Sequence, residues 1–145
     1  MKTLPLLIGL ILGIANFGPP ASAAETASLS VTFSGLKTTK GAIMFTLVDS
    51  ESAYNDKAPA VAQVMLPVTA SSATRTFPMV APGRYAIKAF HDVNGDGKMN
   101  ANPFGIPIEP FAFSNNAVGA MGPAKWESAS FEVKAGANTH SITID

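Results

Sequence analysis

The most suggestive chemistry of this 145-residue chain lies between Asp92 and Lys98, which read DVNGDGK. This run matches the opening of an EF-hand calcium loop, in which oxygen-bearing side chains at alternate positions converge on one hard cation. The twelfth position of such a loop normally holds a bidentate Glu, and here it is Pro103. A ligand from elsewhere must close the shell, so we expect a weak calcium site with a Kd of about 0.1–1 mM. The expected ligands are Asp92, Asn94, Asp96, Lys98 through its backbone carbonyl, and Glu109.

The same run is also typical of a plain turn between two strands. An Asn-Gly pair favours a tight turn, and Asp and Asn side chains accept hydrogen bonds from nearby backbone N–H groups. A turn and a calcium site need the same residue types, so the sequence leaves both interpretations open.

Carboxylates and a histidine near this run raise an enzymatic alternative. A small hydrolase would use Asp92, Asp96, Glu109 or His91 as acid, base or nucleophile. Adjacent strand residues point to opposite faces, however, so His91 and Asp92 would not form a His–carboxylate dyad. We expect His91 to close the end of the core instead.

Aromatic and amide side chains follow in the same part of the chain. They would form either a binding face for a sugar or a peptide, or a small core beneath a loop. The ligand-binding candidates are Phe104, Phe111, Phe113, Asn115, Asn116 and Trp126. A carbohydrate-binding module would use Phe104, Phe111 and Trp126.

Composition excludes several classes of protein. The chain is 47% hydrophobic and 14% charged, which is too apolar for a disordered chain. Its ten basic and ten acidic residues argue against a nucleic-acid partner, which would normally require an excess of Lys and Arg. The absence of Cys removes disulfides, thiolate metal sites, a Cys nucleophile and a lipoprotein anchor.

The N-terminus has the pattern of a secretory signal peptide. Lys2 precedes an apolar run from Leu4 to Ile14, and Ala21-Ser22-Ala23 provides a small-x-small cleavage site. We therefore expect residues 1–23 to be removed and residues 24–145 to form one soluble domain without a membrane anchor. A periplasmic location is expected, with full secretion as the alternative.

Alternating polar and apolar residues predict β-strands along the mature chain. The expected strands cover residues 28–34, 42–48, 61–68, 73–77, 83–92, 130–134 and 139–144. About seven short strands separated by turns favour an all-β, antiparallel sandwich. Residues 93–126 show no period and are expected to form one long, ordered loop that packs over an end of the sandwich, against Phe90.

Several blocks of residues together carry a family resemblance. They are Tyr85–Asp92, Asn94–Met99, Phe104–Pro107, Phe113–Asn116, Gly122-Pro123 and Ala129–Phe131. With these blocks the chain resembles an exported bacterial family called domain of unknown function 2141. The resemblance implies an exported β-sandwich, similar to transthyretin-like or immunoglobulin-like domains, and it implies no activity.

We therefore expect an exported, non-enzymatic binding or structural module of the bacterial cell envelope, with its long loop stabilised by calcium. The expected partner is an envelope protein or a glycan. A small hydrolase and a carbohydrate-binding module are the alternatives.

Overall fold

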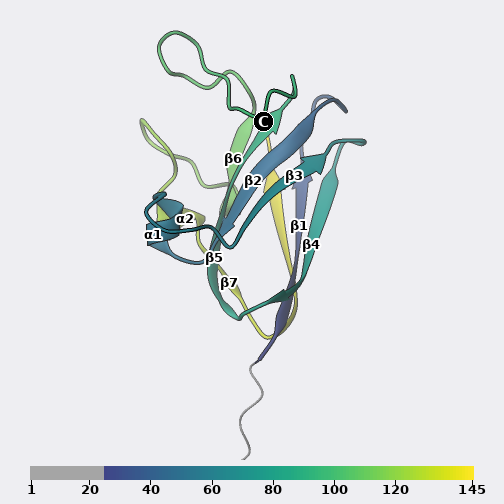
Figure 1. The fold of residues 1–145 in the computed structure, drawn as a ribbon, viewed down its shortest axis with the longest axis vertical. Coiled ribbons are helices and arrows are strands. Elements are labelled where there is room, and N and C mark those ends of the chain that lie inside the picture. The colour runs from purple at the N-terminus through teal and green to yellow at the C-terminus, as the bar shows by residue number, and fades with distance from the viewer. Residues whose placement is uncertain (1–24) are drawn as a thin grey trace, which may run out of the picture.

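The computed structural model describes residues 25–145 (Figure 1). The expected signal peptide, residues 1–23, lies outside the described residues. The strands are β1 (Ala27–Ser34), β2 (Ala42–Val48), β3 (Ala62–Pro67), β4 (Ala73–Val80), β5 (Gly83–Asp92), β6 (Phe111–Phe113), β7 (Phe131–Val133) and β8 (Gly136–Thr143). The helices are α1 (Glu51–Tyr54), the 3₁₀ turn η1 (Ser114–Asn116) and α2 (Trp126–Ala129). Within residues 25–145, no helix has the length and apolar character needed to cross a membrane.

The strands form two sheets, as the predicted all-β sandwich requires. One sheet has the order β4-β1-β8, and the other has the order β3-β2-β5-β6 with β7 also paired to β5. Alternate residues of β1 and β2 fill the space between the sheets, and the rings of Phe33 and Phe45 lie 5.0 Å apart there. The period-two pattern of the sequence thus becomes the core of the fold.

One strand pair departs from the predicted antiparallel arrangement. Strands β1 and β8 run parallel, from Ala27 opposite Gly136 to Ser34 opposite Thr143. The reason is that β7 belongs to the five-stranded sheet, and the chain then crosses to the other sheet before β8 begins. The side chain of Asn138 braces this crossover, because it bonds to the backbone of Lys134 on both its N–H and its carbonyl.

The outward face of the five-stranded sheet carries the features of functional interest. Along β5, Tyr85, Ile87 and Ala89 face the core, whereas Lys88 and Phe90 face outward. At one end of this outward face the helices α1 and α2 cover a second, smaller apolar cluster (Figure 1). The rest of the face is overhung by the segment that follows β5.

Residues 93–126 are not one continuous loop. The chain leaves β5, returns as β6 to pair with β5, and turns through η1 before it reaches α2. Two loops result, residues 93–110 and 117–125. Both project on the side of the sheet that carries α1 and α2, the longer one past the end of the strands (Figure 1), and residues of both line the outward face. The pairing of Phe90 with Phe111 explains this path, because it fixes β6 as an edge strand of the same sheet.

Candidate functional site

The turn that follows β5 is organised around the carboxylate of Asp92. This side chain is buried, and its Oδ1 accepts hydrogen bonds from the N–H groups of Gly95 at 2.7 Å and Asp96 at 3.2 Å. Its Oδ2 accepts from the N–H of Gly97 at 2.8 Å. Gly95 and Gly97 have φ values of 76° and 75°, which glycine adopts without steric cost. The backbone can therefore wrap around one carboxylate, and we call residues 92–100 the Asp92 turn.

The exposed side chains of the Asp92 turn bond to one another and to the backbone. Asn94 Oδ1 accepts from the N–H of Asp96, and Asp96 Oδ1 accepts from the N–H of Lys98. Asp96 Oδ2 accepts from the amides of Asn94 at 3.3 Å and Asn100 at 2.9 Å. The hydrogen bond from Asn100 is the main cause that lowers the pKa of Asp96. These hydrogen bonds favour the ionised form of the carboxylate.

Glu109 closes the base of the turn, although it lies far along the chain. Its Oε1 accepts from the N–H of Val93 and its Oε2 from the N–H of Asn100, both at 3.0 Å. These bonds are charge-assisted, and both are made by a buried carboxylate. The structure therefore brings Glu109 to the same turn as Asp92, as the calcium hypothesis required.

The donor set suits calcium, since every side-chain candidate offers oxygen. Each of these oxygens also accepts a hydrogen bond within the turn, which is what a self-capped turn requires. Across residues 25–145, no group of three His, Cys, Asp or Glu side chains is arranged to hold a metal ion. Calcium at the Asp92 turn stays a prediction.

The residues of the hydrolase alternative do not converge on an open cleft. His91 faces the core, is only 1% exposed, and its Nε2 lies 2.7 Å from the carbonyl oxygen of Lys40. Because a carbonyl can only accept, this nitrogen carries the proton and donates. Asp92 and Glu109 bind backbone N–H groups, which leaves Asp96 as the one exposed member of the set.

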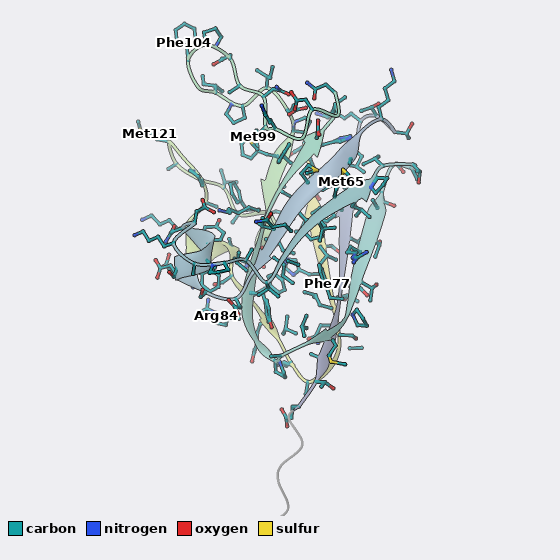
Figure 2. The ribbon with its side chains drawn as sticks, in the orientation of Figure 1. Met65, Phe77, Arg84, Met99, Phe104 and Met121 are labelled. Atoms are coloured by element: carbon teal, nitrogen blue, oxygen red, sulfur yellow. The ribbon has the colours of Figure 1, made fainter. Side chains whose placement is uncertain are left out.

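A hollow of about 1160 Å³ lies on the outward face of the five-stranded sheet, between the sheet and both loops. Directly opposed residues of four strands form its floor. The first row of the floor is Met65, Met44, Phe90 and Phe111. The second row is Gln63, Thr46, Lys88 and Phe113. Met99 and Met121 line it from the two loops (Figure 2), and we call the whole the methionine groove.

The charges in the methionine groove neutralise each other. Lys88 Nζ donates to Asp56 Oδ1 at 2.8 Å and to the carbonyl of Tyr54 at 2.7 Å, and it lies 5.4 Å from the Tyr54 ring centre. No other lining residue is charged. Burial raises the pKa of Tyr54 to about 12, so this phenol stays neutral. The groove therefore offers apolar surface without an unpaired charge.

The aromatic candidates predicted from sequence are divided among three places. Phe111 and Phe113 line the methionine groove, with ring centres 6.0 Å apart. Phe104 lies outside it at the far end of a loop and is 87% exposed (Figure 2). Trp126 packs edge-on against Tyr54 in the smaller apolar cluster. Phe104, Phe111 and Trp126 thus do not form the common face that a carbohydrate site would need.

Asn115 and Asn116 join the two sheets. The side-chain amide of Asn115 donates to the carbonyls of Ser128 and Ser130, and its backbone N–H donates to His140 Nε2 at 3.1 Å. Asn116 Oδ1 accepts from the N–H of Thr143 at 2.8 Å. Both asparagines have positive φ, at 61° and 50°, a conformation that Asn tolerates better than most residues. The polar groups of both asparagines thus make hydrogen bonds that stabilise the fold.

Sequence analysis did not identify the methionines of the groove. Met44 and Met65 lie directly opposite each other on neighbouring strands, which no local pattern reveals. The sequence signal that could have indicated the groove was an apolar residue at a position of each strand that faces outward.

Millimolar calcium is expected to stabilise the protein if the Asp92 turn binds it. At 5 mM calcium and the predicted Kd, binding to the native state adds about 1–2 kcal/mol to the free energy of unfolding. Thermal unfolding with calcium or with chelator measures this, with Asp96→Asn as the variant and Asp145→Asn as its matched control. An unchanged melting temperature in 5 mM calcium would remove the calcium hypothesis.

Replacing Glu109 by Ala is expected to loosen the Asp92 turn. The change removes two charge-assisted bonds and leaves two backbone donors unpaired, at a cost of about 1–3 kcal/mol. Hydrogen exchange should accelerate most at the amides of Val93 and Asn100. Glu127→Ala, at an exposed site, is the control, and unchanged protection of both amides would contradict the assigned role.

The protein is expected to lose stability as the pH falls below about 6.5, the ordinary pKa of histidine. Burial lowers the pKa of His140, and its Nε2 must be unprotonated to accept from Asn115. The unfolded chain therefore binds the proton more readily, so the His140 contribution is complete above that pH and is lost below it. Urea unfolding measures the free energy of unfolding at pH 7.5 and at pH 5.5. The difference between the two values should be smaller for His140→Gln, whose side chain can still accept the hydrogen bond from Asn115, than for the unmodified protein. Equal differences would assign the pH dependence to other groups.

No curated protein and no solved structure matches the chain. Residues 31–141 match a family model described as "Uncharacterized protein conserved in bacteria (DUF2141)". The match extends from β1 to β8 and so includes the Asp92 turn, the methionine groove and both loops. The resemblance seen in the sequence is confirmed, and the chain belongs to the DUF2141 family of bacterial proteins.

Proposed function

We propose that this protein is an exported, non-enzymatic binding module of the cell envelope that holds an uncharged, apolar ligand in the methionine groove. The observation that carries the proposal is the gathering of methionines. Of the five methionines in residues 25–145, four line this groove: Met44, Met65, Met99 and Met121. Methionine is flexible and polarisable, so a surface rich in it can adapt to apolar ligands of different shape.

Exposure of the groove supports a binding role rather than a structural one. Met65 is 67% exposed, and Met99 and Phe111 are each 40% exposed, so none of the three is completing the core. Large apolar side chains gathered in an open hollow usually mark a ligand or partner site. The volume of about 1160 Å³ accommodates a ligand of ordinary small-molecule size or a segment of an apolar chain.

The chemistry of the lining disfavours the two alternatives. A hydrolase needs a titratable group that is free to act, and Lys88 and Asp56 are paired with each other. A sugar site needs several hydrogen-bonding groups beside its aromatic rings, and the uncharged polar side chains of the lining are Thr46 and Gln63. The groove fits an apolar ligand better than either.

Export is supported by the signal-peptide pattern of residues 1–23. In the envelope of a bacterium, an apolar ligand would be sparingly soluble and would benefit from a protein that shields it from water. We therefore infer a carrier or receptor for an apolar envelope component, in the periplasm or after secretion.

Binding of N-phenyl-1-naphthylamine, a neutral fluorescent probe, tests the groove. We expect saturable fluorescence enhancement that 1-decanol reverses. Met65→Glu places a charge on the groove floor at an exposed position of an edge strand, and it should weaken binding at least about tenfold because the carboxylate must be desolvated.

Met79→Glu is the matched control, since Met79 is 76% exposed and lies on β4 of the opposite sheet. It should bind the probe like the unmodified protein. Absence of saturable binding, or an equal loss in both variants, would refute the proposed function.

A further inference from the structure

We infer that the two loops beside the methionine groove dock onto a lipid surface that bears anionic headgroups. The docking surface consists of residues 99–108 and 117–122, and its contact residues are Phe104, Ile106, Ile108, Val118 and Met121. Phe104, Ile108 and Val118 do not line the groove, whereas Ile106 and Met121 do. Variants at the first three positions therefore test docking separately from ligand binding.

The contact side chains are among the most exposed apolar residues of the protein. Phe104 is 87% exposed, Val118 is 89% exposed and Met121 is fully exposed, and Ile106 and Ile108 are exposed by more than half. Figure 2 shows Phe104 and Met121 at the far ends of two loops that project on the same side of the molecule. Such a concentration of apolar side chains at protruding ends is costly in water unless a partner covers it.

The docking surface contains no charged residue. Between Lys98 and Lys125 the single ionisable residue is Glu109, although 14% of the whole chain is charged. Glu109 is buried and binds the backbone of the Asp92 turn, so it adds no exposed charge. The first charged residues on either side, Lys98 and Lys125, are both exposed and basic.

This pattern of apolar ends with lysines behind them fits a lipid interface. Apolar side chains can enter the boundary between headgroups and acyl chains, while lysines remain at the level of anionic headgroups. A protein interface of standard size covers about 800 Å² of continuous surface on each partner. Here the apolar side chains occupy two separate loop ends, which insert more readily into a fluid surface than into a rigid one.

Several backbone N–H groups of the longer loop are hydrogen-bonded within the loop, which suits an apolar medium. Asn102 Oδ1 accepts from the N–H groups of Phe104 and Ile106, each at 3.0 Å, and the N–H of Asn102 donates to the carbonyl of Ile106 at 2.9 Å. The N–H of Gly105 also donates within this loop, to the carbonyl of Asn102. An unsatisfied N–H would oppose insertion into lipid, and these donors are already satisfied. The loop can therefore present Phe104 without breaking hydrogen bonds.

A fluorescent label at Phe104 tests the inference directly. The chain contains no Cys, so Phe104→Cys and Met79→Cys each accept one environment-sensitive dye. With vesicles of phosphatidylglycerol and phosphatidylcholine in equal parts, emission from position 104 should shift to the blue, whereas emission from position 79 should not. No shift at position 104 would overturn the inference. A shift that occurs without vesicles as protein concentration rises would show that the loops cover one another in a dimer, and would also overturn it.

Vesicle co-sedimentation measures the contributions of the apolar and basic residues. The double variant Phe104→Ser with Ile108→Ser should lower the partition coefficient at least about tenfold, whereas Met79→Ser should not change it. Lys98→Gln and Lys125→Gln should each lower binding to the anionic vesicles about fivefold, with Lys134→Gln as the control. All variants have the same N-terminal sequence, so a difference in vesicle binding between two variants comes from the substituted residues. Equal binding by the loop variants and their controls would refute the inference.

Discussion

The outward face of this protein depends on how two buried carboxylates bind the backbone. Asp92 holds the N–H groups of Gly95, Asp96 and Gly97, and Glu109 holds those of Val93 and Asn100. Such bonds are stronger than those between neutral groups, and a buried charge without them would be expensive. They hold the chain where it leaves β5, at the start of the longer of the two loops that border the methionine groove.

Sequence analysis predicted the elements that follow from local periodicity. Strands β1 and β5 were expected because their apolar residues recur at every second position, and Leu29, Val31 and Phe33 are indeed buried. Strand β2 was expected because residues 42–48 form a short run that is apolar on nearly both faces. The parallel pairing of β8 with β1 was not predictable, since it depends on a change of sheet between β7 and β8 that no local pattern encodes. The role of Glu109 was partly foreseen. Its proximity to Asp92 was expected from its charge, but its bonds to two backbone amides become visible only in three dimensions.

The aromatic residues of the outward face lie in two different surroundings. Trp126 and Tyr54 pack together in the smaller apolar cluster, whereas Phe111 and Phe113 line the methionine groove, and Phe113 also packs against that cluster. Phe111, Phe113 and Trp126 all occur in the same aperiodic segment, so the local sequence does not distinguish them. Only the pairing of β6 with β5 decides which of them face the groove.

The parallel pairing of β1 and β8 also has a mechanical consequence. Tension applied between Ala27 and Thr143 would pull the two adjacent strands along their length in opposite directions. Their ladder of hydrogen bonds would then be loaded in shear, and many bonds would have to break together rather than one after another. The fold is therefore built to resist stretching along this axis.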